Sequence, residues 1–281
     1  TLPVDDLKKI LSTIASYTNE SGAHLVGLNM EGPFISVSKK GAQDERNIIP
    51  CDAALFREFQ EAARGLIRFI GVAPETGLDR TLDFIREFKG EVSVSLAHTN
   101  ASYTDAKAAF DAGACHAVHL FNAMPAFTHR EPGVVGAVFD SKHVFAELIC
   151  DGVHIHPAMV RAAFAMMGAE RICLISDSMR AAGMPDGSYT LGGLAVNVSG
   201  KHATLAEGGA LAGSVTNLAD CMRTAVKEMD IPLEEAIRCA TLNPARALHL
   251  EHRYGSIAPG KAGNLVLLNP DLSLKQVIVN G

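Results

Sequence analysis

Apolar residues recur along this chain in short continuous runs, separated by segments in which they follow helical spacing. The runs contain few polar residues, which is typical of strands covered on both faces by helices, as in a parallel sheet. Helices are predicted between nearly all of them, so the pattern favours an α/β architecture of βα repeats. The six predicted strands span residues 25–31, 67–73, 92–98, 115–120, 145–150 and 172–177.

The remaining segments give the other elements that we expect. The region between residues 121 and 144 is interpreted as a long loop, and residues 189–206, with glycine-rich turns and alternating polarity, as a hairpin. The tail after residue 262 predicts two short strands outside the main sheet. Helices are predicted at 4–18, 52–65, 77–88, 103–112, 157–167, 214–228 and 233–248.

Composition narrows the class of protein. A chain of 281 residues that is 48% hydrophobic can bury a large core. The net charge of −6 argues against a nucleic-acid-binding surface, and no apolar run approaches a membrane span. The six cysteines are scattered without a close pair, so we expect free thiols and a reducing, cytoplasmic location.

Ionisable residues stand where four of the predicted strands end. Glu31, His98, His119 and Asp177 end the first, third, fourth and sixth strands, and Asp151 and His154 follow the fifth. In βα-repeat folds the carboxyl ends of the strands meet at one edge, where ligands bind. A single histidine at a strand end is more often a core residue whose nitrogens are hydrogen-bonded. Four ionisable residues at the ends of four different strands instead predict a shared site.

The residue types in this set suggest metal chemistry. Glu31, His98 and His119 supply a carboxylate and two imidazoles, which suit a catalytic zinc ion with one position open to water. Iron or another first-row metal would accept the same ligands. A metal-bound water ionises near neutrality, and Asp177 is then interpreted as the general base and acid. The alternative for Asp177 is a helix N-cap.

The loop 121–133 follows His119 directly and carries candidate substrate contacts. Asn122 can bind a hydroxyl or phosphate oxygen, and Arg130 suits a bidentate contact with a phosphate or carboxylate. The alternative for Arg130 is an ion pair with a surface acid. His154 is expected beside the same opening. The other histidines, including His116, are interpreted as structural or solvated.

Several long motifs resemble the N-acetylglucosamine-6-phosphate deacetylase family of the amidohydrolase superfamily. They include MEGPFISVSKKGA, AHTNASY, HLFNAMPAFTHREPGVVGA, CDGVHIHP and SDSMRAAGMPDGSYTLGG, in order from residue 28. The resemblance implies a (β/α)8 TIM-like barrel with a small β-sandwich domain, and a metal-dependent hydrolase that releases acetate from N-acetylglucosamine 6-phosphate. It also implies a homodimer in which Arg130 serves the neighbouring subunit's site.

Carried over by position, the resemblance assigns the site residues. Glu31, His98 and His119 match the family's metal ligands, and Asp177 matches its catalytic aspartate. Gln43 stands where the family often has a substrate-facing histidine, so it is expected to bind the sugar without carrying charge. The positions that match the family's sugar-phosphate contacts are Asn122, the backbone of Ala123, Arg130 and His154.

The same resemblance predicts the domain limits. Residues 1–252 are expected to form the barrel domain with about six of its eight strands, because the family's N-terminal segment has no counterpart here. Residues 253–281 are expected to be strands of the β-sandwich domain. That missing segment would decide whether one or two metal ions bind. The alternatives are a non-catalytic sugar-phosphate binder, an inactive fragment, or an amidohydrolase acting on another acylated amine or cyclic amide.

Overall fold

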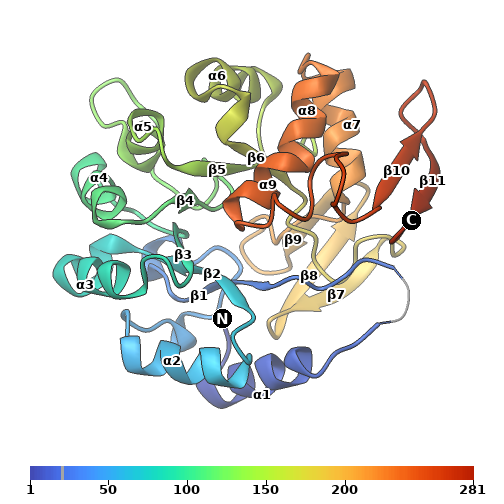
Figure 1. The fold of residues 1–281 in the computed structure, drawn as a ribbon. Coiled ribbons are helices and arrows are strands. Elements are labelled where there is room, and N and C mark those ends of the chain that lie inside the picture. Colours follow the sequence, from blue (N-terminus) through green and yellow to red (C-terminus); the bar gives the residue numbers. More distant parts are fainter. Residues whose placement is uncertain (20–21) are drawn as a thin grey trace.

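A curved parallel sheet wrapped by helices forms the body of the molecule (Figure 1). The computed structural model describes residues 1–19 and 22–281. The six strands pair in sequence order, each with the next, and every pairing is parallel. They are β1 (Leu28–Phe34), β2 (Ile67–Val72), β3 (Ser93–Leu96), β4 (His116–Ala117), β5 (Phe145–Ile149) and β6 (Ile172–Ile175).

Helices connect the strands and cover the outer face of the sheet (Figure 1). One α-helix precedes β1, and one lies between each pair of consecutive strands, as expected for βα repeats. In chain order these are α1 (Val4–Ala15), α2 (Ala53–Ala62), α3 (Leu78–Phe88), α4 (Tyr103–Ala112), α5 (Gly133–Asp140) and α6 (Pro157–Met167). Three further helices, α7 (Leu218–Glu228), α8 (Leu233–Ala240) and α9 (Leu242–Ala247), come later.

Two small antiparallel sheets complete the fold. The first has three strands, β7 (Gly187–Leu191), β8 (Leu194–Ser199) and β9 (His202–Leu205). The second pairs β10 (Leu265–Leu268) with β11 (Leu274–Ile278), and Figure 1 shows it standing apart at the C-terminal end. The expected strands outside the main sheet are therefore confirmed, whereas the division into domains at residue 252 stays a prediction.

The expectations for the long loop, the hairpin and the last predicted helix were wrong. The long loop before β5 contains α5, which is apolar on all sides and so has no helical periodicity to detect. The hairpin at 189–206 is a three-stranded sheet. The helix expected at 233–248 is two helices that break at Thr241, whose φ of −133° is not helical. Pro244 lies three residues further on and has no N–H for the carbonyl of the preceding turn.

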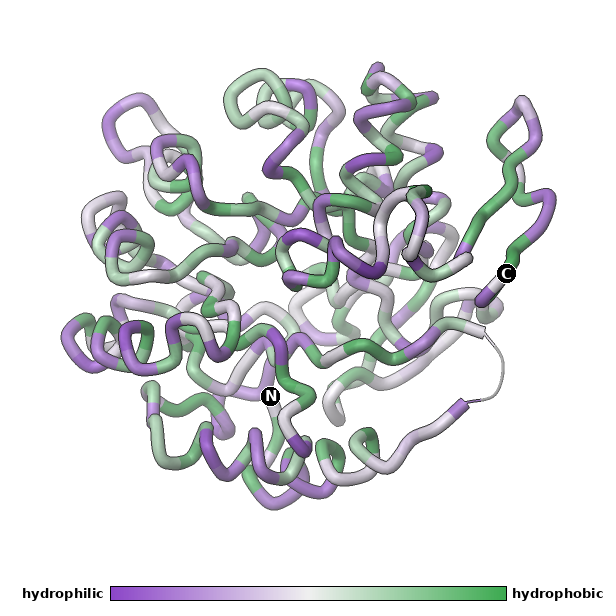
Figure 2. Tube along the Cα trace, viewed as in Figure 1, coloured by the Kyte–Doolittle hydropathy of each residue, from purple (hydrophilic) through white to green (hydrophobic). Residues whose placement is uncertain are grey.

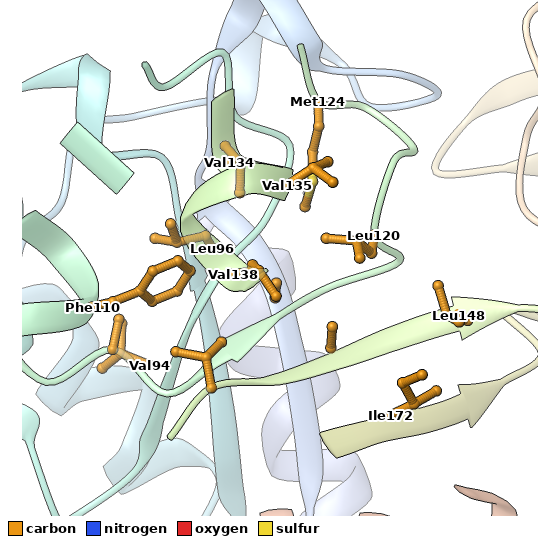
Figure 3. Close-up of a cluster of buried hydrophobic side chains, with 14 of the residues drawn as sticks. Val94, Leu96, Phe110, Leu120, Met124, Val134, Val135, Val138, Leu148 and Ile172 are labelled. Carbon is orange, nitrogen blue, oxygen red and sulfur yellow. The ribbon is translucent and has the colours of Figure 1, made fainter. Parts of the chain in front are cut away.

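The core lies between the sheet and its outer helices. Figure 3 shows Val94 and Leu96 from β3 beside Phe110 of α4, with Val134 and Val138 of α5 in the same cluster. All five are at most 3% exposed. Figure 2 shows apolar colour along the strands and alternating colour along the outer helices. Among the described residues, no helix is long and apolar enough to cross a membrane.

The opposite face of the sheet is more polar. Ser95 on β3, His116 on β4 and Glu147 on β5 are polar and nevertheless buried. Residues of β1 and β6 line the same cavity of about 490 Å³, so the sheet curls until its first and last strands face each other across its interior. The six cysteines are free, as expected.

Candidate active site

Glu31 lies inside β1, where the strand bulges. We expected the strand to end at Glu31 and Gly32–Pro33 to turn the chain away, but β1 continues to Phe34. The pairing with β2 is irregular between Met30 and Phe34. The bulge brings the Glu31 carbonyl so close to Gly71 of β2 that a Cβ atom there would lie 2.3 Å from the oxygen. Gly71 therefore permits the bulge that turns the Glu31 carboxylate toward the sheet interior.

The two histidines and Asp177 each lie two residues beyond the end of a strand. His98 follows β3, His119 follows β4 and Asp177 follows β6. Their φ angles are 43°, 30° and 50°, in the left-handed region that residues other than glycine rarely adopt. Such conformations persist only where surrounding contacts hold them, and they gather at functional sites.

The expected metal ligands meet at one point. Oε1 of Glu31 lies 3.0 Å from Nε2 of His98 and 2.9 Å from Nε2 of His119. The two Nε2 atoms are 3.2 Å apart. One ligand atom from each residue thus lies within 4.8 Å of the others. The structure brings together three residues that are far apart in the sequence.

The other ring nitrogens show that this donor set fits a metal ion. Nδ1 of His98 donates to the Lys39 carbonyl at 2.7 Å, and Nδ1 of His119 donates to the Asn122 carbonyl at 3.1 Å. Because a carbonyl can only accept, both Nδ1 atoms carry a proton, which leaves Nε2 as the nitrogen able to bind a cation. Two imidazoles and one carboxylate match a divalent first-row metal site.

Charge within the triad shifts the pKa values of its members. Burial opposes the ionisation of Glu31, but hydrogen bonds from His119 and His98 outweigh it and hold the pKa of Glu31 well below its usual range. Burial likewise favours neutral His119, but the Glu31 carboxylate outweighs it and raises the pKa of His119 to about 9. A proton and a metal cation therefore compete for Nε2 of His119.

Asp177 is held beside the triad by the segment that leads into α7. The backbone N–H of Ser214 donates to the Asp177 carbonyl at 2.7 Å, and the Ser214 carbonyl accepts from the N–H of Met179 at 2.8 Å. Burial raises the pKa of the Asp177 carboxyl to about 6, against the opposing charge of His119. A carboxyl with a pKa near neutrality can both accept and return a proton during a reaction.

One cavity of about 650 Å³ contains almost all of the predicted site residues. It is lined by Glu31, His98, His119, Asp177, Asn122, Ala123, His154 and Gln43. Arg130 is exposed on the loop between β4 and α5 and does not line this cavity. Its expected contact with substrate therefore has no support within a single chain.

Gln43 contacts a predicted metal ligand. Its Nε2 donates to Oε2 of Glu31 at 2.6 Å. The oxygen of Glu31 that faces the histidines is Oε1, so Gln43 binds the other one. We expected Gln43 to bind the sugar, and that role stays a prediction.

His154 is oriented by Asp151. Nδ1 of His154 donates to Oδ2 of Asp151 at 2.7 Å, and the backbone N–H groups of Val153 and His154 donate to Oδ1. Burial opposes the ionisation of Asp151, but the hydrogen bonds from His154 and Val153 outweigh it and hold the pKa of Asp151 below its usual value. Because Nδ1 is engaged, His154 is left with Nε2 for contacts in the cavity.

Sequence reasoning missed the residues that shape the cavity. Lys39 lines it and donates from Nζ to the Met124 carbonyl at 3.0 Å, which ties two loops together. Met179, Leu191 and Leu211 give the cavity an apolar side. The lysine pair in SVSKKGA was a signal for Lys39, but nothing in the local pattern indicated that the antiparallel sheet would lie against the site.

Comparison with known proteins identifies the family. The model of the amidohydrolase family matches residues 9–281. The chain is 38% identical over 261 residues to N-acetylglucosamine-6-phosphate deacetylase from Bacillus subtilis, covering 92% of this chain and 65% of that protein. It is 37% identical to N-acetylgalactosamine-6-phosphate deacetylase from Escherichia coli, covering all of this chain and 74% of that protein.

Solved structures agree with the sequence relatives. A mutant of N-acetyl-D-glucosamine-6-phosphate deacetylase from Mycobacterium smegmatis, in complex with N-acetyl-D-glucosamine-6-phosphate, superposes with a TM-score of 0.91 at 34% identity. The match covers all of this chain and 74% of that one. The chain thus spans just under two thirds of the Bacillus subtilis relative and about three quarters of the other two proteins.

Proposed function

This chain belongs to the amidohydrolase family, and on that premise we propose that its protein removes the acetyl group from N-acetylglucosamine 6-phosphate. The products are glucosamine 6-phosphate and acetate. The observation that carries the proposal is the meeting of Glu31, His98 and His119 in a cavity that also contains Asp177. The names of relatives that are 34–38% identical supply the substrate class.

We assign zinc to the triad, with iron or another first-row metal as the alternative. When bound, a divalent cation acts as a Lewis acid that polarises the amide carbonyl and makes a nearby water more acidic. Asp177 accepts the proton from the attacking water as the carbon–oxygen bond forms. It then donates that proton to the amine nitrogen as the carbon–nitrogen bond breaks. Asn122, the backbone of Ala123, His154 and Gln43 hold the sugar phosphate.

The acetylated galactosamine phosphate is a second candidate substrate. The relative from Escherichia coli that carries that name is 37% identical, against 38% for the Bacillus subtilis protein, so identity does not separate the two sugars. They differ in the orientation of one hydroxyl group. A non-catalytic binder is not favoured, because the raised pKa of Asp177 beside the triad suits proton transfer.

The first experiment measures zinc content and acetate release on the whole protein that contains these residues. We expect about one zinc or more per chain and faster release from N-acetylglucosamine 6-phosphate than from either the galactosamine epimer or unphosphorylated N-acetylglucosamine. Removal of the metal with a chelator should abolish release, and added zinc should restore it. Stoichiometric zinc without acetate release from any of the three would refute the deacetylase function.

We further propose a homodimer in which Arg130 contacts the phosphate in the partner's cavity. Its exposure and its absence from its own cavity support this arrangement. Arg130→Ala should raise KM for the phosphorylated sugar by about tenfold or more, and raise it much less for the unphosphorylated one. Equal effects on both substrates would exclude the phosphate contact.

Mixed dimers test whether that contact crosses the interface. Neither Arg130→Ala nor Asp177→Asn alone should have full activity. In a heterodimer of the two variants, one cavity would receive an intact Asp177 from its own chain and an intact Arg130 from the partner. Recovery of about half the wild-type activity per heterodimer supports the crossing, and no recovery contradicts it. The cytoplasmic location stays a prediction.

A further inference from the structure

Glu147 and His116 form a buried polar pair beneath the triad that the proposed reaction does not use. Glu147 is 5% exposed and His116 is 2% exposed. Nε2 of His116 donates to Oε1 of Glu147 at 3.0 Å, and the His116 ring packs on Phe69 with centroids 4.7 Å apart. An acid placed in a strand interior costs free energy of burial, so its position calls for a reason.

The second oxygen of Glu147 reaches the backbone of a predicted metal ligand. The N–H of His119 donates to Oε2 of Glu147 at 3.1 Å, and the N–H of the next residue, Leu120, donates to the Glu147 carbonyl at 2.8 Å. Glu147 thus holds two consecutive residues, through its side chain and its main chain. His116 binds the other carboxylate oxygen and so fixes the orientation of Oε2.

The contact lies just beyond β4, which is the shortest strand of the parallel sheet. That strand has two residues, His116 and Ala117, and it ends before the ligand. His119 adopts a φ of 30°, which a side chain makes unfavourable unless neighbouring contacts hold it. At the other two left-handed positions, His98 and Asp177, backbone N–H groups of Ser36 and Ser214 bind the carbonyls. At His119 the carbonyl accepts from the N–H of Asn122 at 2.9 Å, and a carboxylate additionally binds the backbone N–H.

We propose that Glu147, oriented by His116, is a positioning residue for the metal site: it holds the His119 backbone so that Nε2 faces Glu31 and His98. The inference rests on the proposed metal-dependent function. Residues that orient metal ligands typically change metal affinity by about 10- to 100-fold when they are replaced. Glu147 would therefore act on the metal through His119, without contact with substrate.

The test compares variants of Glu147 with a matched control elsewhere in the core. Glu147→Ala removes the acceptor, and Glu147→Asp keeps the charge but withdraws it by one methylene. Glu147→Gln retains one carbonyl oxygen for the N–H of His119. The control is Asn243→Ala, because Asn243 is fully buried and donates to the carbonyls of Ala169 and Ile172 near the start of β6, away from the ligands.

Each protein is assayed for its zinc dissociation constant by chelator competition, for the absorption spectrum of bound cobalt, and for thermal unfolding. We expect Glu147→Ala and Glu147→Asp to weaken zinc binding by about 10- to 100-fold and to alter the cobalt spectrum. Glu147→Gln should remain within about threefold of wild type. Asn243→Ala should lower the unfolding temperature and leave zinc affinity within about twofold.

The outcomes separate this inference from the proposed function. If the wild type binds no zinc, the metal site and this inference both fail. If the wild type binds zinc and the folded Glu147→Ala and Glu147→Asp variants bind it within about twofold of wild type, only the positioning role fails. It also fails if Asn243→Ala weakens zinc binding as much as Glu147→Asp does. Should Glu147→Ala not fold, the contrast between weakened zinc binding in Glu147→Asp and near-wild-type binding in Glu147→Gln decides the question.

Discussion

The parallel sheet and the antiparallel sheet β7–β8–β9 border the same cavity but contribute different groups. From β1 and the ends of β3, β4 and β6 come a carboxylate, two imidazoles and a second carboxyl. The antiparallel sheet and its flanking loops present Leu191, Gly192 and Leu211. The parallel sheet therefore carries the reactive groups, and the antiparallel sheet provides the apolar surface. Changes to the first should alter metal binding and kcat, and changes to the second should alter KM.

The largest effect is expected at Asp177. Asp177→Asn keeps the size of the side chain but removes the proton acceptor, so kcat should fall by about three orders of magnitude or more. Zinc affinity and substrate affinity, measured separately, should stay close to wild type. A loss of less than tenfold in kcat would mean that another group accepts the proton.

The next largest effect is expected at Glu31. Glu31→Gln removes the negative charge that faces both histidines, so zinc affinity should fall by more than the roughly 10- to 100-fold typical of an outer-shell residue. Glu45→Gln is a suitable control, because Glu45 is exposed nearby in the chain and pairs with Lys40. Zinc affinity that survives Glu31→Gln would show that the triad is not the metal site.

The pH dependence of kcat/KM should reflect the ionisation of Asp177. Its raised pKa of about 6 means that the base loses its negative charge as the pH falls through that value. The rate constant kcat/KM should therefore be highest above pH 6 and fall about tenfold per unit below it. A cation held by Glu31, His98 and His119 would stabilise the charged form of Asp177 and move this acid limb to lower pH. If the pH profile of Asp177→Asn shows the same decrease at low pH, that decrease reflects the ionisation of a different group.

The smallest effect is expected in the antiparallel sheet. Leu191→Ala removes apolar surface from the cavity, so KM should rise by about threefold to tenfold while kcat changes by less than twofold. Leu194→Ala is the matched control, because Leu194 pairs with Leu191 across the turn and does not line the cavity. A large fall in kcat for Leu191→Ala would show that the antiparallel sheet also affects the chemical step, so the two sheets would not differ in role.

Sequence predicted those site residues whose positions depend only on the order of the strands. Glu31, His98, His119 and Asp177 were expected together because the carboxyl ends of parallel strands share one edge, and they line one cavity. Asn122, Ala123, His154 and Gln43 line it as well, whereas Arg130 does not. A residue on an exposed loop has no strand to fix its direction, so its place depends on contacts that a sequence pattern does not contain.

Contacts between side chains on the inner face of the sheet could not be predicted, for a different reason. His116 and Glu147 lie in the runs CHAVHL and FAELIC, which are apolar enough to indicate buried strands but do not reveal which residues face inward. Their pairing depends on the register between β4 and β5, where His116 lies opposite Phe145. The helix α5 was missed because apolar residues cover its whole circumference. Periodicity identifies elements that have a solvent face, and these features lack one.

The order of the ligands along the chain bears on how the protein matures during translation. Glu31, His98 and His119 all precede residue 120, whereas Asp177 follows roughly 60 residues later. At ordinary rates of synthesis that interval lasts about 3–12 s. The nascent polypeptide therefore carries the three proposed metal ligands for several seconds before the ribosome adds the residue proposed to transfer the proton.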